Sequence, residues 1–111
     1  MTILNKYNQE IYALMRIVVG VLFACHGAQK LLGMFGGAHP GAPAYIIYIA
    51  GGIELIGGLM IAVGFKTSIA AFLSSGLMAV GYFMAHQPQG LLPIQNGGEL
   101  AAVYAFVFLY I

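Results

Sequence analysis

Residues 10–32 read EIYALMRIVVGVLFACHGAQKLL, an apolar run that is long enough to cross a lipid bilayer as a single helix. A transmembrane helix needs about 20 mostly apolar residues. The run is continuously apolar instead of alternating with period two, which favours a helix over a strand of a membrane barrel. Gly33, Gly36 and Gly37 follow it and break the helical pattern. The sequence therefore predicts a first transmembrane helix over residues 10–32.

Three further apolar stretches follow along the chain. Residues 44–65 and residues 68–87 are both long enough to span a bilayer, and Pro88 stops the second of these two runs. The last stretch, residues 99–111, would be about 20 Å long as a helix, short of a hydrocarbon core about 30 Å thick. We therefore expect the numbered chain to stop before the fourth helix ends; the alternative is a helix that ends inside the bilayer.

The composition indicates the same class of protein. Of the 111 residues, 61% are hydrophobic and only 6% are charged, whereas about a quarter of the residues of a soluble domain are charged. Short links between spans make neighbouring helices antiparallel. We predict an all-α fold, an integral membrane four-helix bundle with antiparallel up-down helices, forming a single transmembrane domain over residues 1–111. The net charge of +1 offers no basic patch, so nucleic acid is not an expected partner.

The positions of the loop lysines predict the orientation of the chain. Lys6 precedes the first helix and Lys66 links the second to the third, so both lie on one side of the membrane. Cytoplasmic loops are enriched in Lys and Arg, which places these lysines, and with them both termini, in the cytoplasm. Lys30, near the other end of the first helix, weighs against this orientation. The first residues resemble no cleavable signal peptide, so we expect the first helix to be retained.

Charged side chains inside the predicted spans are the most informative feature of the sequence. Such a group costs about 2.5 to 3.5 kcal/mol or more unless it is paired or faces water. Arg16 lies in the first span and Glu54 near the middle of the second. Antiparallel packing would bring them within about two turns of each other, so we predict a buried polar network, with an Arg16–Glu54 pair or both residues in it. The alternative is that these charges only fix the helix register.

A second group of polar residues is expected toward the other side of the membrane. His26 and Lys30 belong to the first helix, His86 to the end of the third and Glu99 to the start of the fourth. Together they could hydrogen-bond a quinone, with aromatic and Met walls from Tyr45, Tyr48, Tyr82, Phe83 and Met84. Two His and a carboxylate could also bind a metal or a haem, but no metal site is predicted because neither spacing is diagnostic. Histidines satisfied within the bundle are the remaining reading, and Cys25 is expected to be an inert buried thiol.

Several of these motifs, taken in order, resemble the DoxX family. Residues 15–37, MRIVVGVLFACHGAQKLLGMFGG, match its pattern of an Arg, a Gly, the motif H-G-x-x-K-L and a Gly-rich loop. Residues 51–65, GGIELIGGLMIAVGF, resemble its second-helix signature with Glu54 as the acidic member. The segment that ends in Ala85-His86 and the later NGGEL of residues 96–100 resemble the third and fourth helices. The resemblance covers nearly the whole chain.

This resemblance implies a four-helix protein of a bacterial-type inner membrane, in the company of redox proteins. The family takes its name from a small membrane subunit associated with thiosulfate:quinone oxidoreduction. We therefore expect a small membrane subunit of a redox complex, with lipid and other subunits as partners. A quinone could be housed in it, but the resemblance leaves the cofactor open. The alternatives are a non-catalytic assembly subunit and a small transporter, which would have to form a homo-oligomer. The chain has no CxxC or nucleotide-binding loop, so an autonomous enzyme is not expected.

Overall fold

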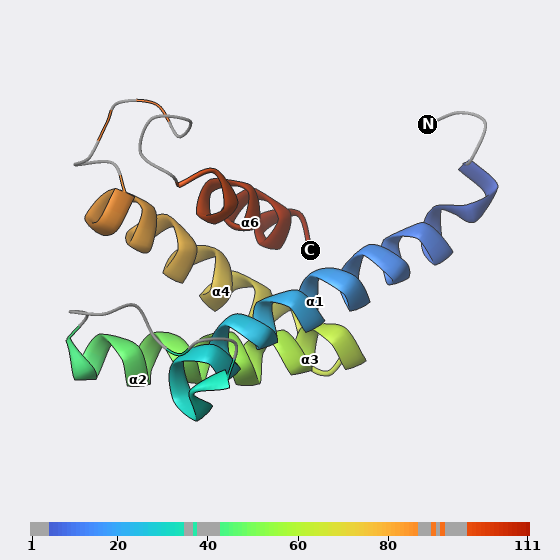
Figure 1. Ribbon diagram of the computed structural model, residues 1–111. Coiled ribbons are helices and arrows are strands. Elements are labelled where there is room, and N and C mark those ends of the chain that lie inside the picture. Colours follow the sequence, from blue (N-terminus) through green and yellow to red (C-terminus); the bar gives the residue numbers. More distant parts are fainter. Residues whose placement is uncertain (1–4, 35–36, 38–42, 87–89, 91, 93–97) are drawn as a thin grey trace. The chain divides into compact units, whose positions relative to one another are not determined.

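The computed structural model describes residues 5–34, 37, 43–86, 90, 92 and 98–111, apart from the side chains of residues 85 and 86. All regular structure in these residues is helical, and no strand occurs among them (Figure 1). The elements, in chain order, are η1 (Asn5–Tyr7), α1 (Asn8–Leu32), α2 (Ala44–Gly52), η3 (Ile53–Gly57), α3 (Gly58–Val63), α4 (Thr67–Gly81), η4 (Tyr82–His86) and α6 (Glu99–Tyr110). Here η1 is a 3-10 turn, and η3 and η4 are π-helical turns. The predicted all-α fold is confirmed.

The predicted helices agree with the observed ones to within a few residues. Three helical runs are long and apolar enough to cross a membrane: Asn5–Leu32, Ala44–Val63 and Thr67–Met84. The second run is continuous because α2, η3 and α3 follow one another without a break. The fourth helix, α6, is shorter, and the predicted end of the third helix at residue 87 lies outside the described residues. The chain is therefore a multi-pass membrane protein.

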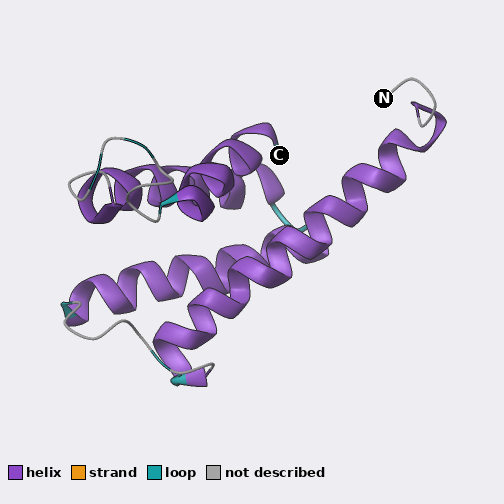
Figure 2. Ribbon diagram, turned by 45° about the horizontal axis from the view of Figure 1, so that its top comes forward, coloured by secondary structure: helices purple, strands orange, loops and turns teal. Residues whose placement is uncertain are grey.

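The structure divides into two compact units, residues 1–66 and residues 67–111. In the first unit, α1 packs antiparallel along α2, η3 and α3 (Figures 1 and 2). Glycines make this packing close: a Cβ added at Gly20 would lie 2.6 Å from the Gly58 carbonyl oxygen, and one at Gly27 would lie 2.7 Å from the Gly51 carbonyl oxygen. Small residues at such seams let helix backbones approach in lipid. The prediction of a single domain over the whole chain stays a prediction.

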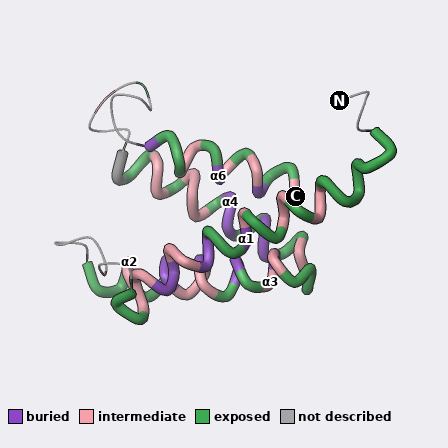
Figure 3. Tube along the Cα trace, turned by 45° about the vertical axis from the view of Figure 1, so that its right-hand side comes forward, coloured by how far each residue is buried: buried purple, intermediate pink, exposed green. Residues whose placement is uncertain are grey.

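The buried face of α1 follows the helical period. Its buried residues are Gly20, Phe23, Ala24, Gly27 and Ala28, a spacing of three and four residues that forms one stripe. Figure 3 shows this stripe in the C-terminal half of α1, while the N-terminal turns are mostly exposed. Because Gly20 lies against Ala62 near the end of α3, the turns of α1 before it run past that end. The exposed apolar side chains elsewhere on these helices form the surface that faces lipid.

In the second unit, α4 packs against α6 (Figure 2). Ala70, Ala71 and Ser74 of α4 are buried, as are Tyr104 and Phe108 of α6. The hydroxyl of Ser75 donates a hydrogen bond of 2.7 Å to the carbonyl oxygen of Ala105. This bond joins the two helices through a backbone acceptor and so satisfies a hydroxyl in an apolar setting.

Candidate functional site

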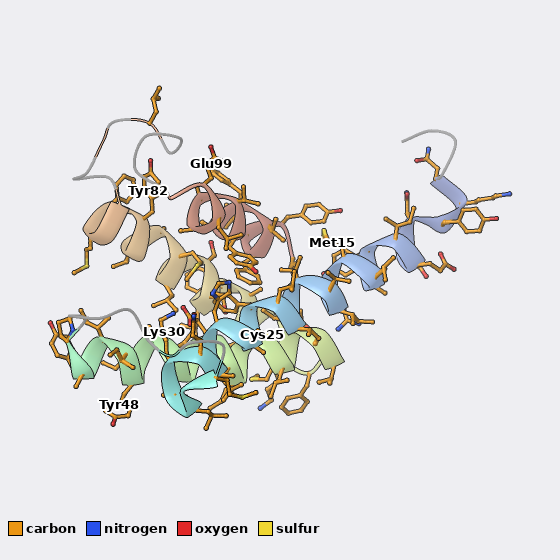
Figure 4. All side chains as sticks on the ribbon, viewed as in Figure 1. Met15, Cys25, Lys30, Tyr48, Tyr82 and Glu99 are labelled. Carbon is orange, nitrogen blue, oxygen red and sulfur yellow. The ribbon has the colours of Figure 1, made fainter. Side chains whose placement is uncertain are left out.

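A partly buried ion pair joins α1 to the π turn η3. The Lys30 ammonium donates to both oxygens of the Glu54 carboxylate, at 2.9 Å to Oε1 and 2.7 Å to Oε2. The Glu54 side chain is only 5% exposed and that of Lys30 is 26% exposed, and Figure 4 shows Lys30 on the C-terminal half of α1. A membrane protein usually pairs the charges it buries. The predicted position of Glu54 inside the helix pair is thus what the structure shows, with Lys30 as its partner.

In the structure Arg16 and Glu54 bind different partners, and the register of the two helices, with the tilt of their side chains, explains why. A wider network that includes both residues stays a prediction. Every Cα–Cβ bond in a helix points toward the N-terminus. On α1 this direction carries Arg16 away from Glu54 and carries Lys30 toward it. Glu54 belongs to the antiparallel partner and leans toward Lys30 in turn. The register of the pair puts Gly27 against Leu55 and Gly20 against Ala62. Lys30 is therefore about one turn from Glu54 along the helix axis, and Arg16 is about three turns from it.

Arg16 instead binds the carboxyl end of α3. Its Nη1 donates to the carbonyl oxygens of Ile61 and Ala62, the latter at 3.0 Å. The last four carbonyls of a helix have no partner within the helix, and the negative end of the helix dipole attracts a cation. Arg16 thus supplies the charge and the hydrogen bonds that the end of α3 lacks.

Gly64 makes room for this contact. It follows Val63 with φ 81, in the left-handed region where glycine ends many helices. Its own N–H and that of Phe65 donate to the Met60 carbonyl oxygen, each at 2.9 Å. A Cβ added at Gly64 would lie 2.9 Å from Arg16 Nη1. A glycine after the last apolar residue of a helix is the signal in the sequence for such a cap.

The π turn η3 is the second feature that the sequence did not predict. It contains Glu54, and it lies where α1 comes closest, because a Cβ added at Gly27 would clash with the backbone nitrogen of Leu55. π turns inside α-helices occur frequently at functional sites. The only sequence signal for it is the pair of double glycines on either side, Gly51-Gly52 and Gly57-Gly58.

The structure brings together only some of the predicted site residues. His26 lies one turn before Lys30 on α1 and is half-buried. Glu99 is exposed at the start of α6, in the second unit. His86 ends η4, and its side chain lies outside the described residues. A shared site of His26, Lys30, His86 and Glu99 therefore stays a prediction. Among the side chains that the structure describes, no three His, Cys, Asp or Glu groups converge as metal ligands would.

The ion pair leaves Lys30 with donor capacity. An ammonium group has three N–H donors, and the two bonds from Lys30 to the Glu54 carboxylate use at most two of them. Within the described part of the chain, Lys30 has no hydrogen-bond acceptor other than Glu54. Lys30 is also the more exposed partner. The pair can therefore donate a hydrogen bond to a carbonyl or an anion that reaches it through the apolar part of the membrane.

Comparisons with known proteins identify the group to which this chain belongs. The DoxX family profile matches residues 11–87. A protein of Haemophilus influenzae, described as "Uncharacterized protein", is 40% identical over 115 residues, which cover 96% of this chain and 84% of that protein. A protein of Bacillus subtilis, described as "Putative oxidoreductase CatD", is 36% identical over 74 residues, which cover 63% of this chain and 55% of that protein. No solved structure matches significantly. The chain belongs to the DoxX family of membrane proteins.

Proposed function

We propose that this protein is a small membrane subunit of a redox complex, and that Lys30, held by Glu54, is the donor that binds a quinone head group. The observation that carries the proposal is the ion pair itself, with Glu54 5% exposed and Lys30 26% exposed between apolar helices. The word oxidoreductase in the description of the relative from Bacillus subtilis supports the redox setting. The electron donor would be another subunit of the complex.

The residues of this site fit a quinone in their chemistry. A quinone carbonyl accepts hydrogen bonds, and Lys30 has an N–H beyond those given to Glu54. His26, one turn away at a spacing of four residues, lies on the neighbouring part of the same face of α1. A bound quinone would supply a two-electron, two-proton redox couple. The role of this chain would be to orient the head group through Lys30 and His26 and to hold the Lys30 side chain in place through Glu54.

A second candidate function is that of a non-catalytic assembly subunit. The observation that favours it is that the three charges on the packed faces of the first unit also hold helices together: Lys30 binds Glu54, and Arg16 binds the end of α3. Such bonds fix helix register without any chemistry. Under this alternative, changing the charges lowers the amount of the complex and leaves the activity of each assembled complex unchanged.

Purification of the protein from its native membranes in a mild detergent tests the two candidates. We expect redox subunits to co-purify in stoichiometric amounts together with extractable quinone. The double variant Lys30→Gln/Glu54→Gln should keep a neutral hydrogen bond between the helices but lose the ammonium donor. We expect it to retain the partner subunits. The amount of quinone bound per complex should fall about tenfold or more, because a charge-assisted hydrogen bond is worth about 1.5–3 kcal/mol. Quinone per complex is measured by mass spectrometry.

Lys6→Gln is the matched control, because it removes one exposed lysine outside the helix pair. It should retain both the subunits and the quinone. Unchanged quinone in the double variant, with less complex in the membrane, would favour the assembly subunit. A wild-type protein that purifies only with itself would contradict both candidates.

We further propose that the protein lies in a bacterial-type inner membrane with both termini in the cytoplasm. Lys6 and Lys66, at the same end of the helix pair, support this orientation through the preference of basic residues for the cytoplasmic side. Single cysteines in a Cys25→Ser background test it with a maleimide that cannot cross membranes. We expect Lys66→Cys to react only after spheroplasts are opened and Met34→Cys, at the other end of α1, to react in intact ones. The reverse pattern would overturn the orientation.

A further inference from the structure

If the run Ala44–Val63 spans the hydrocarbon core, the end of α3 that Arg16 binds would lie at the boundary of the membrane. The run Ala44–Val63 has 20 residues, which as a helix extends about 30 Å and so matches the thickness of the hydrocarbon core. On such a span Val63 would lie at the level where lipid head groups begin. The Arg16 guanidinium lies at this level too, since Nη1 binds the carbonyl oxygens of Ile61 and Ala62.

Arg16 has more donors than its protein partners use. A guanidinium carries five N–H groups, and both bonds that it makes to the described residues come from Nη1. The N–H groups of Nε and Nη2 have no acceptor in the described part of the chain, although the residue is half-buried. These groups form the planar fork that binds a phosphate through two parallel hydrogen bonds.

A second cation follows close by in the chain, with its ammonium 5.5 Å from the centroid of the Phe65 ring. Lys66 is exposed and follows Gly64 by two residues in the link after α3, so its Cα lies within about 7 Å of the Gly64 Cα. Gly64 itself adjoins Arg16 Nη1. The acidic residues do not neutralise the pair: Glu54 binds Lys30, and Glu10 lies about 120° around α1 from Arg16. Two positive charges thus face the head-group level without a carboxylate between them in the described residues.

We infer that Arg16 and Lys66 bind the phosphate of an anionic membrane lipid at the end of α3. The chemistry recognised is a phosphate ester, and the membrane presents such groups at high density at the depth where the two cations lie. Basic residues near the membrane surface attract anionic lipid with about 1 kcal/mol each. The Arg16 fork orients the phosphate, Lys66 adds charge, and the same arginine links the bound lipid to the helix end.

Thermal unfolding of the full-length protein in a neutral detergent tests this site. Added phosphatidylglycerol should raise the melting temperature in a saturable way, and phosphatidylcholine should not. Lys66→Gln changes an exposed side chain and should fold normally, while its apparent affinity for phosphatidylglycerol falls about fivefold. Arg16→Lys keeps the charge but loses the fork, so the affinity should fall about tenfold or more.

Lys6→Gln is the control, since it removes an equal charge from the exposed start of the chain, and it should leave the affinity unchanged. An equal loss in Lys6→Gln and Lys66→Gln would overturn the site, because it would show attraction to net charge alone. Equal stabilisation of the wild type by the two lipids would overturn it as well. Stabilisation by millimolar inorganic phosphate to the same extent as by the lipid would replace the lipid with a soluble anion and contradict the proposal.

Discussion

Gly27→Ala is expected to lower the free energy of unfolding by about 3 kcal/mol or more, the largest effect of any single methyl group in the first unit. The added Cβ would clash with the backbone nitrogen of Leu55 and lie 2.7 Å from the Gly51 carbonyl oxygen. Both atoms belong to the backbone of the facing helix, so no rotation of a side chain relieves the contact. The helices must separate along a seam that also carries the Lys30–Glu54 pair. Equilibrium unfolding in mixed micelles measures the loss.

Gly52→Ala is the matched control for this change. It lies next to Gly51 on the facing helix, and a Cβ added there meets no described atom within 4 Å. Alanine is a better helix former than glycine by about 1 kcal/mol, so this variant should be as stable as the wild type or more stable. A loss of similar size in both variants would contradict the backbone contact at Gly27, because it would indicate a general intolerance of these helices to substitution.

Lys30→Met should destabilise the protein by about 3–5 kcal/mol, the range measured when one partner of a buried ion pair is removed. The change leaves the Glu54 carboxylate 5% exposed and deprived of its cation. Methionine has nearly the volume of lysine, so lost packing contributes little to the effect. The protein should accumulate in the membrane in smaller amounts and unfold at lower denaturant.

The double variant Lys30→Met/Glu54→Met separates the charge from the packing. Replacing both partners with apolar side chains removes the unpaired carboxylate, so we expect the double variant to regain most of the stability lost in the single one. Lys6→Met, outside the helix pair, should change stability by less than about 0.5 kcal/mol. A double variant as unstable as the sum of its single variants would mean that the two residues do not stabilise the fold through each other.

The helices of this protein could be predicted from its sequence because lipid imposes a simple requirement. Every backbone polar group must be satisfied within the span, so a long apolar run specifies a helix whatever its neighbours are. The predicted start of the second helix at residue 44 and its observed start at Ala44 agree. The burial of Glu54 could be predicted for the same reason, since a charge in the middle of an apolar helix has to be covered.

The partners of the buried charges could not be predicted in the same way. Arg16 and Lys30 lie on one face of α1, and residue counting along two antiparallel helices places Glu54 between them. The register in which the two helices pack decides the outcome: Gly27 lies against Leu55 and Gly20 against Ala62, so Lys30 is near Glu54 and Arg16 is near the end of α3. The π turn around Glu54 depends on tertiary contact with α1 and has no periodic pattern of its own. The geometry of the site is therefore harder to predict from the sequence than the positions of the transmembrane helices.

The pairing of α1 with α2, η3 and α3 has a consequence for how the chain is made. The partners of Arg16 and Lys30 all precede Lys66, so the ribosome has synthesised every member of these bonds before it reaches the third span. Inserting a lysine or an acidic residue alone costs about 2.5 to 3.5 kcal/mol at the centre of a helix. Entry of the first two spans together, as a hairpin, would let Lys30 and Glu54 leave the translocon already neutralised.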